Sequence, residues 1–303
     1  MNTNKKILIT HNGSFHTDDI FTAATLSLLL EKKGESFEIV RTRDPEVIEK
    51  GDYVFDVGGI YDENTNRFDH HQKGGVGFRK VDKERELSIE YASFGLVWRK
   101  FGAELSGGEK VARIIDRCLV APVDAFDNGF NLVESKYNAS PYLIQDAFIS
   151  MRPTWQEEDL SVDDMFLKCV NIAKIFLYRE ITQVKSALIA EEKVLEIYNK
   201  TEDKRVIILD KSYPYEYTLS NFPEPFFVVV QREADGLWGV KAVKKNLKSF
   251  KNRKDFPESW GGLRDEDLQK VTGVSDAVFC HKALFLTVAK SKEGAIKLAL
   301  LSL

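Results

Sequence analysis

Histidine is scarce in this chain of 303 residues, yet four of its five histidines lie in two tight clusters within the first quarter of the sequence. His11 and His16 form one cluster, His70 and His71 form the other, and acidic residues stand beside both. A single histidine is as often a core residue as a ligand, but two such clusters are hard to explain by packing. Imidazole mixed with carboxylate is the ligand chemistry of divalent cations, so the pattern predicts a metal site.

Three carboxylates complete the predicted site: Asp18, Asp56 and Asp69. Asp56 is the best candidate for a bridging ligand, because it would lie between the loops that carry the other ligands. The candidate ligands outnumber those that one ion can hold, so we expect two cations; Mn²⁺ suits them well, and Mg²⁺, Zn²⁺ or Fe²⁺ also fits. Two neighbouring cations can clamp a phosphoryl group and activate water, which predicts a metal-dependent hydrolase.

The hydrophobic pattern around these residues alternates between strands and helices. It predicts strands at 7–10, 38–42 and 53–57, with helices that begin near 18 and near 44. This order is typical of a parallel α/β sheet, in which ligands bind outside the carboxyl ends of the strands. His11 and Asp56 both lie at or near such ends. The predicted elements therefore place the two residues where an α/β protein binds its ligands.

The rest of the pattern predicts two domains, residues 1–155 and residues 156–303. In the first, we expect helices at 88–101 and 109–119, then a compact acidic turn at 122–129 that contains Asp124 and Asp127. A long helix at 161–198 connects the domains, where it either packs between them or forms a homodimer interface. The second domain is expected to be smaller and α+β, with strands at 205–209, 226–231, 238–243, 278–281 and 284–288 and a closing helix at 292–301.

Five residues outside the metal site are candidates for substrate binding. Gly261 and Gly262 allow the backbone to approach a phosphate closely, and Arg264 can bind a phosphate through two donors, although an ordinary turn explains this segment equally well. His281 follows a strand and is either a cleft residue or a structural one. Arg152 either lines the cleft or caps the helix that follows it.

The basic segment 241–254 carries seven Lys or Arg residues around Phe250. Such runs are usually solvated surface, and the alternative is a track for a nucleic-acid backbone. The net charge of −4 excludes a global positive field. Three cysteines far apart in the chain are expected to be reduced thiols of a cytoplasmic protein. The polar start and the absence of a long apolar run predict neither a targeting segment nor a membrane span.

Six segments of the sequence resemble the melanocyte-proliferating-gene family, which is related to the DHH phosphoesterases. The segments are Thr10–Asp19, Phe55–Asp62, Arg67–Gln72, Val123–Gly129, Arg152–Trp155 and Trp260–Glu266. They cover nearly the full length and are specific in combination, whereas Asp-His-His alone is a weak signal. DHH phosphoesterases include RecJ-type nucleases and manganese-dependent inorganic pyrophosphatases. The resemblance implies a DHH-like catalytic domain at 1–155 and a substrate-binding domain after the linker helix.

The resemblance also implies a role for each candidate residue. One metal would be held by His11, His16 and Asp56, and the other by Asp18, Asp56, His70 and either Asp124 or Asp127, with Asp124 preferred. His71 would contact the substrate phosphate or donate a proton, and Asp69 would have a supporting role beside the ligand His70. The predicted catalytic residues are therefore His71, Asp69 and Asp56. His16 is a departure, because related pyrophosphatases have an aspartate there, and the site therefore carries less ligand charge.

The predicted function is that of a 3′–5′ exonuclease that hydrolyses RNA or short oligonucleotides at a two-metal site. Two alternatives stay open. The chain could instead hydrolyse a small phosphorylated metabolite or a dinucleotide, which the net negative charge mildly favours. It could also bind metal without catalysis. The sequence holds no feature that specifically supports peptide cleavage.

Overall fold

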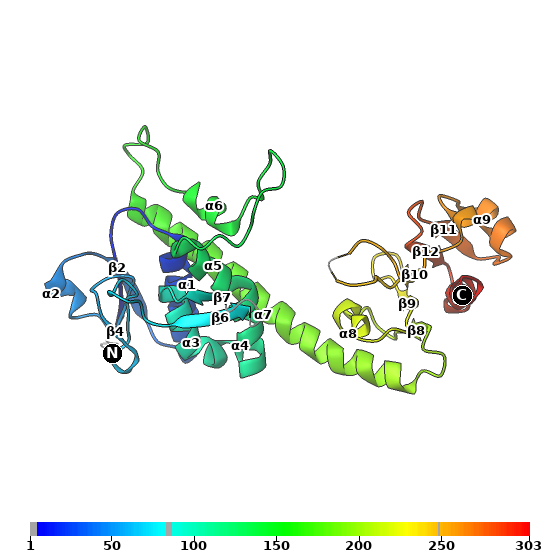
Figure 1. Ribbon diagram of the computed structural model, residues 1–303, viewed down its shortest axis with the longest axis horizontal. Helices are drawn as coiled ribbons and strands as arrows, with labels where there is room; N and C mark the ends of the chain where they lie inside the picture. Colours follow the sequence, from blue (N-terminus) through cyan, green and yellow to red (C-terminus); the bar gives the residue numbers. More distant parts are fainter. Residues whose placement is uncertain (1–4, 83–86, 248) are drawn as a thin grey trace. The chain divides into compact units, whose positions relative to one another are not determined.

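The computed structural model describes residues 5–82, 87–247 and 249–303, and the chain divides into two compact units, residues 1–184 and residues 185–303. Helix α7 (Val162–Lys200) runs from the first unit into the second (Figure 1), which confirms the long helix predicted at 161–198. The predicted domain boundary at residue 155 precedes this helix, whereas the division between the units falls inside it. Among the described residues, no helix is long and apolar enough to cross a membrane.

The first unit is built on a five-stranded sheet (Figure 1). Its elements are β1 (Lys6–Thr10), β2 (Phe37–Arg41), β3 (Tyr53–Phe55), β4 (Tyr61–Asp62) and β5 (Arg67–Phe68), with a 3₁₀ helix at Glu63–Thr65 between the last two. The strand order is β2-β1-β3-β5-β4. All pairs are parallel except β4 with β5, which confirms the predicted parallel α/β sheet. The loops that follow β1, β3 and β5 therefore leave from the same edge of the sheet.

Side chains alternate between the two faces of this sheet, and each face has its own cover. On one face, Ile9 belongs to a small core with apolar residues of α2 (Pro45–Ile48). On the other face, the ring of Phe101 in α3 (Ser93–Ser106) lies 6.0 Å from the ring of Phe68. The two central strands β1 and β3 carry the most buried apolar runs, ILI and YVF, as expected for strands that are covered on both faces.

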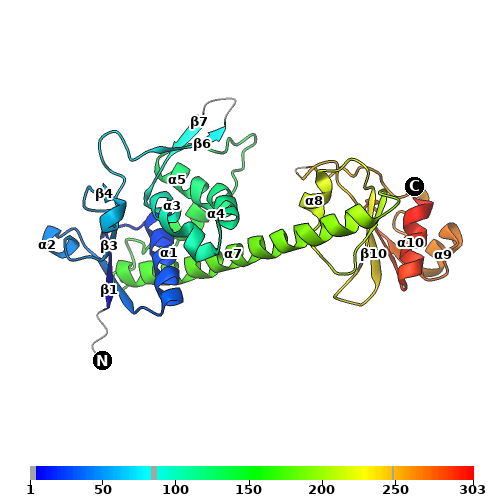
Figure 2. The ribbon, with the colours of Figure 1, turned by 90° about the horizontal axis from the view of Figure 1, so that it is seen from below.

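Helix α1 (Thr17–Lys33) is buried along most of its length and packs against α3 (Figure 2). Its Asp18 carboxylate accepts hydrogen bonds from the first two backbone N–H groups of α3, from Ser93 at 3.2 Å and from Phe94 at 2.7 Å. The first N–H groups of a helix have no partner inside the helix, so an acceptor from elsewhere helps to define where the helix begins. Asp18 thus joins the two helices at the edge of the site.

The prediction of a helix at 88–101 is wrong for its first residues. The segment forms β7 (Leu87–Glu90), which pairs antiparallel with β6 (Phe78–Asp82), and α3 begins only at Ser93. The pairing gives residues 87–90 backbone partners in a strand. The acceptor that caps α3 comes from a residue distant in sequence, which no local hydrophobic period reveals.

Asp124 and Asp127 lie on a helix, which corrects the compact turn predicted at 122–129. The chain forms α4 (Glu109–Ile115), a π-helical segment (Asp116–Val120), α5 (Ala121–Asp127) and, further on, α6 (Ile144–Ile149). Pro122 has no N–H to donate, and the wider π-helical turn before it shifts the hydrogen bonds so that the helix continues past the proline. A helix holds Asp124 and Asp127 more rigidly than a turn would.

The second unit contains a second five-stranded sheet. Its elements are β8 (Val206–Ile208), α8 (Glu216–Ser220), β9 (Phe227–Gln231), β10 (Trp238–Ala242), a 3₁₀ helix (Glu258–Trp260), α9 (Asp265–Thr272), β11 (Ala277–Cys280), β12 (Leu286–Ala289) and α10 (Lys292–Leu301). The strand order is β11-β12-β10-β9-β8, with only β8 and β9 parallel among the pairs described. The predicted hairpin of β9 and β10 and the predicted closing helix are confirmed.

The apolar residues of strand β9 pack against apolar residues on both faces of this sheet. Phe227 and Val229 point into a core that includes residues of α9 and α10. Val228 and Val230 point the other way, into a core with α8 and the end of α7. Because successive side chains of a strand alternate, four consecutive apolar residues require apolar neighbours on both sides.

Candidate metal centre

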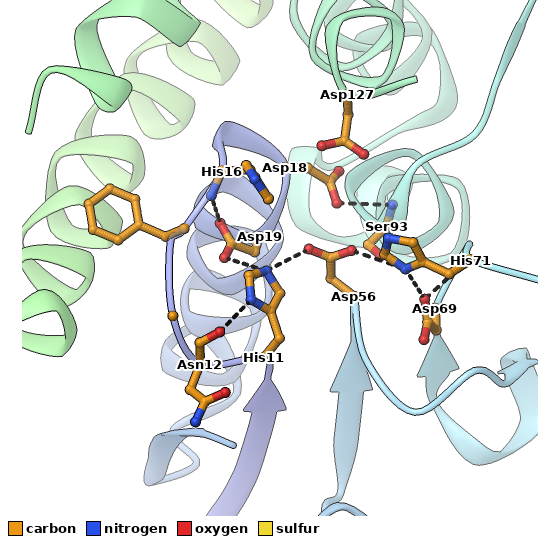
Figure 3. Close-up of polar contacts among 12 residues, drawn as sticks. His11, Asn12, His16, Asp18, Asp19, Asp56, Asp69, His71, Ser93 and Asp127 are labelled. Carbon is orange, nitrogen blue, oxygen red and sulfur yellow. Dashed lines mark hydrogen bonds and ion pairs between the residues drawn. The ribbon is translucent and has the colours of Figure 1, made fainter. Parts of the chain in front are cut away.

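The strand ends of the first sheet bring the histidine clusters together. His11 directly follows β1, Asp56 directly follows β3, and the triplet Asp69–His71 directly follows β5, so all leave from one edge of three neighbouring parallel strands. Figure 3 shows Asp56 in the middle, with His11 and Asp19 on one side and Asp69 and His71 on the other. Asp56 has a φ of 56°. This left-handed conformation is unusual for a residue other than glycine and is often found at functional sites.

The Asp56 carboxylate lies between the two histidine clusters. Its Oδ2 is 3.2 Å from His11 Nε2, and its Oδ1 is 3.3 Å from His70 Nε2. Each of these ring nitrogens also faces a second carboxylate: His11 Nε2 is 3.3 Å from Asp19 Oδ2, and His70 Nε2 is 3.2 Å from Asp127 Oδ2. A ring nitrogen carries at most one proton and cannot donate well to two acceptors.

Among the described residues, two atoms of this cluster are buried without a hydrogen bond: Asp19 Oδ2, which faces His11, and His70 Nε2, which faces Asp56 and Asp127. Buried polar atoms are nearly always satisfied, so both atoms call for an explanation. A divalent cation supplies it, because neutral imidazole nitrogens and carboxylate oxygens would all direct lone pairs at the ion. The donor set therefore fits a metal ion.

Three groups of residues have ligand atoms within 4.8 Å of one another: His11, His16 and Asp56; Asp56, His70 and His71; and Asp18, His70 and Asp127. Asp56 is shared by the first two groups and His70 by the last two. In Figure 3, Asp18 and Asp127 point toward each other above Asp56. Overlapping groups that share a carboxylate are suited to hold more than one cation.

The electrostatics of the cluster show an excess of negative charge. Burial disfavours protonation of His11, but Asp19 and Asp56 outweigh it and raise the His11 pKa to about 10. Burial opposes protonation of His70 in the same way, yet Asp127, Asp56 and the charge of Asp18 raise its pKa to about 11. Burial also raises the pKa of Asp18 well above its usual value, with help from the charges of Asp127 and Asp56. Carboxylates in such a place need protons or metal cations for compensation.

Asp19 and His16 are linked through the start of α1. The backbone N–H of His16, the residue before α1, donates to Asp19 Oδ1 at 2.9 Å. The His16 ring is exposed, with its centroid 5.6 Å from that of His11. Asp19 is absent from the predicted set of site residues. The sequence carries a local indication of this contact, because an acidic residue three positions after the residue that caps a helix commonly accepts a hydrogen bond from that residue's backbone N–H.

The two aspartates of α5 have different partners. Asp127 faces His70, as described above, whereas Asp124 is fully buried and accepts hydrogen bonds from Arg79 Nη1 at 2.7 Å and from the backbone N–H of Gly95 at 3.0 Å. A Cβ atom at Gly95 would lie only 1.9 Å from Asp124 Oδ2, so this approach requires glycine. The geometry favours Asp127 over Asp124 as a metal ligand, the reverse of the order preferred from the sequence.

The ring of His71 is held in place by the carboxylate of Asp69. The Asp69 carboxylate accepts from His71 Nδ1 at 2.7 Å, from the His71 backbone N–H at 3.1 Å and from the Gly59 N–H at 2.5 Å. The hydrogen bond to Asp69 raises the pKa of His71, against the effect of burial. The His71 side chain is 62 % exposed, so it can meet a ligand.

A cavity of about 860 Å³ opens over part of the cluster, and its charged and imidazole lining residues are His11, His16, Asp56, Asp69, His71 and Asp127 together with Arg43 and Arg152. Arg43 is absent from the predicted set, because nothing in its local sequence distinguishes it from a surface arginine. Arg152 has a structural role as well, since its Nε donates to the carbonyl of Phe15 at 2.8 Å, in the loop between His11 and His16. The cavity thus combines candidate metal ligands with two cationic side chains.

The other predicted substrate residues form a local cluster in the second unit. The Gly262 N–H donates to the carbonyl of Cys280 at 3.0 Å, and Gly262 has a φ of 81°. The guanidinium of exposed Arg264 lies 4.4 Å from the centre of the Phe279 ring. His281 Nδ1 accepts from the Ala283 N–H at 3.0 Å. At Gly261, a Cβ would lie 3.1 Å from a Leu284 methyl group, so a larger residue there would press on that side chain.

The fold and the site define an α/β protein with a histidine and aspartate cluster at the carboxyl ends of its strands. The family model of the MYG1 exonucleases, described as "Uncharacterised protein family (UPF0160)", matches residues 7–303. The chain belongs to this family, which confirms the resemblance drawn from the motifs. It is 31 % identical to the human MYG1 exonuclease over 96 % of this chain and 84 % of the human protein. It is also 31 % identical to the MYG1 protein of Dictyostelium discoideum, over 98 % of this chain and 96 % of that protein.

Proposed function

We propose that this chain is a metal-dependent 3′–5′ exonuclease that hydrolyses RNA or short oligonucleotides at a site for two cations, with Mn²⁺ the best match. The observation that carries the proposal is the position of Asp56, whose two carboxylate oxygens reach the two histidine clusters separately. Relatives named exonuclease support the reaction class. The ligands proposed for one cation are His11, His16 and Asp56, and those for the other are Asp18, Asp56, His70 and Asp127.

Bound together, two such cations would activate a water molecule and neutralise the charge of the phosphoryl group. The side chains around them have separate tasks. Asp69 accepts a hydrogen bond from His71 Nδ1 and so orients the ring, which leaves Nε2 to donate a proton to the leaving oxygen or a hydrogen bond to the phosphate. Arg43 and Arg152 line the same cavity and provide positive charge for neighbouring phosphates.

Replacing His71 with alanine is expected to lower kcat about a hundredfold, the scale of one lost general acid, while both cations stay bound. Activity should be measured as a pH profile, together with metal content by elemental analysis. Loss of the basic-side pKa from the profile, with unchanged metal content, is the expected result. If the variant instead loses one equivalent of metal, His71 is a ligand and its proposed role is wrong. The Asp69→Asn variant should share the defect in weaker form.

The substrate and direction can be tested with the purified chain, Mn²⁺ and RNA labelled at either end. A 3′–5′ exonuclease shortens a 5′-labelled RNA progressively and releases a single labelled nucleotide at once from a 3′-labelled RNA. Chelation of the metal should stop both reactions. Unchanged RNA, DNA and dinucleotides in the presence of Mn²⁺, from a protein that binds the metal, would contradict the proposal and support a non-catalytic metal-binding protein.

Hydrolysis of a dinucleotide or a small phosphorylated metabolite is the second candidate. The size of the cavity supports it, since about 860 Å³ is in the range of pockets that enclose small ligands. Comparing kcat/KM for a dinucleotide with that for RNA of increasing length separates the two. The second candidate predicts the highest value for the dinucleotide, whereas the first predicts a rise with length. Gly261, Gly262, Arg264 and His281 stay predictions as further substrate contacts.

A further inference from the structure

A second cavity, of about 770 Å³, lies in the second unit, and neither Gly261 nor Gly262 lines it. It is lined by the end of β10 and the segment that follows it, by α8 and by the turn before β12. Figure 1 and Figure 2 both show the gold loop after β10 lying beside α8. Every lining residue belongs to the second unit, so this cavity is defined by that unit alone.

The cavity presents aromatic rings that folding leaves uncovered. Phe250 is 95 % exposed and Phe285 is 40 % exposed, while a third lining ring, that of Tyr215, is buried. The Phe285 ring also lies 4.5 Å from the ring of His281. Leaving a phenyl ring in water forfeits the free energy of burying it, so two such rings at one cavity indicate a surface that a ligand covers.

The charge at this cavity is positive. Lys241 and Lys244 line it and face a single acidic residue, Glu216. In the described part of the chain, neither lysine has an ion-pair partner, and Lys244 Nζ lies 5.4 Å from the centre of the Phe250 ring. The segment 241–254 contains no acidic residue, although the whole chain carries a net charge of −4. The positive charge is therefore local to this surface.

Not every basic residue of that segment is available to a ligand. Arg253 donates to the backbone carbonyls of Leu219, Ser220 and Pro225, and Lys254 donates to the carbonyl of Leu303. These two side chains hold the segment against the rest of the unit. Lys241 and Lys244 make no such contacts with the backbone carbonyls of the described residues, so a structural role explains only part of the basic segment.

We propose that this cavity binds single-stranded nucleic acid, with a base stacked on Phe250 and neighbouring phosphates held by Lys241 and Lys244. A ring beside a cation matches the alternation of base and phosphate along a strand, whereas an acidic protein segment would match the lysines only. As a site for the substrate of the exonuclease, the proposal rests on the proposed function. As a binding site, it can be tested without catalysis.

The test measures binding of a fluorescent single-stranded RNA of about twelve nucleotides, the scale of strand that such surfaces contact. The full chain is used in the presence of EDTA, which prevents hydrolysis and removes the contribution of bound metal. Phe250→Ala is expected to weaken binding about tenfold, as loss of one base stack does, and Phe250→Trp to preserve it. Lys244→Ala should weaken binding and reduce the slope of log affinity against log salt by about 0.7, one phosphate contact on a single strand.

Matched controls are Tyr217→Ala, which removes an exposed ring of α8 that does not line the cavity, and Lys270→Ala, which removes an exposed lysine of α9. Both should bind like the parent protein. The proposal is overturned if the parent does not bind, if Phe250→Ala binds as tightly as the parent, or if a polyglutamate peptide competes as well as unlabelled RNA. If the protein hydrolyses RNA but Phe250→Ala has no effect on binding, this binding site is refuted and the proposed function stands. If the protein binds RNA through Phe250 but hydrolyses none, the proposed function is refuted and the binding site stands.

Discussion

Replacing Asp56 with asparagine is expected to lower Mn²⁺-dependent hydrolysis about a thousandfold or more, because one substitution removes the carboxylate shared by the two proposed cations. Asparagine keeps the size of the side chain and tolerates the left-handed backbone that Asp56 adopts. The folded chain should therefore survive, and the loss should appear as lost metal. Calorimetric titration with Mn²⁺ should show two sites in the parent and at least one fewer in the variant.

Asp52→Asn is the matched control, since Asp52 lies just before β3 and pairs with Lys6 at 2.9 Å rather than with a histidine. It should retain both activity and metal stoichiometry. Thermal denaturation gives an independent readout, because a ligand that binds only the folded state stabilises it. Mn²⁺ should raise the Tm of the parent and of the control and raise that of Asp56→Asn much less. Full activity in Asp56→Asn would refute the shared-ligand arrangement.

Replacing Arg79 with alanine is expected to destabilise the protein by about 3–5 kcal/mol, the cost of leaving a buried charge without its partner. Arg79 is buried, and its guanidinium donates to Asp124 Oδ2 at 2.7 Å and to Asp116 Oδ1 at 2.9 Å. Asp124 is fully buried and cannot turn toward water. Because these residues tie β6 to α5, which also carries Asp127, we expect the variant to bind Mn²⁺ more weakly as well.

The loss should depend on pH in a defined direction. Burial raises the pKa of Asp124 to about 7, although Arg79 pulls it down, so removal of Arg79 raises it further. A carboxyl group whose pKa is higher in the folded state than in the unfolded state loses folding stability as the pH rises through the folded pKa. Arg79→Ala should thus be more destabilising at about pH 8 than at about pH 5, where the lone Asp124 can be protonated.

Arg99→Ala serves as the control for the loss of an arginine. Its ion pair with Glu63, at 2.9 Å, is partly exposed. Pairs of this kind contribute at most about 1 kcal/mol, so urea denaturation should show a small change with little dependence on pH. Equal losses in Arg79→Ala and Arg99→Ala, or a loss for Arg79→Ala that grows as the pH falls, would show that the buried pair does not act as described.

Much of the fold follows from local pattern. The apolar runs of β1 and β3, the hairpin of β9 and β10, the long helix α7 and the closing helix α10 lie close to where the sequence predicts them. Each has a strong hydrophobic period or a clear turn between two strands. The errors in the predicted elements lie where residues that are distant in the sequence determine the local structure. Ser88 to Glu90 form a strand because β6 pairs with them, and α3 starts at Ser93, where Asp18 supplies the capping carboxylate.

By itself, the sequence determined which side chains could hold a cation and that His11 and Asp56 stand at or near the ends of buried strands. Both depend on residue type and short-range order, which a chain carries in its linear pattern. Only the tertiary structure decided which carboxylate meets which histidine. Asp127 faces His70 while Asp124, one helical turn earlier, faces Arg79, and Asp19 joins His11. Those pairings depend on how α1, α3 and α5 pack together, because a contact of a few ångströms is set by the packing of helices that are distant in the sequence.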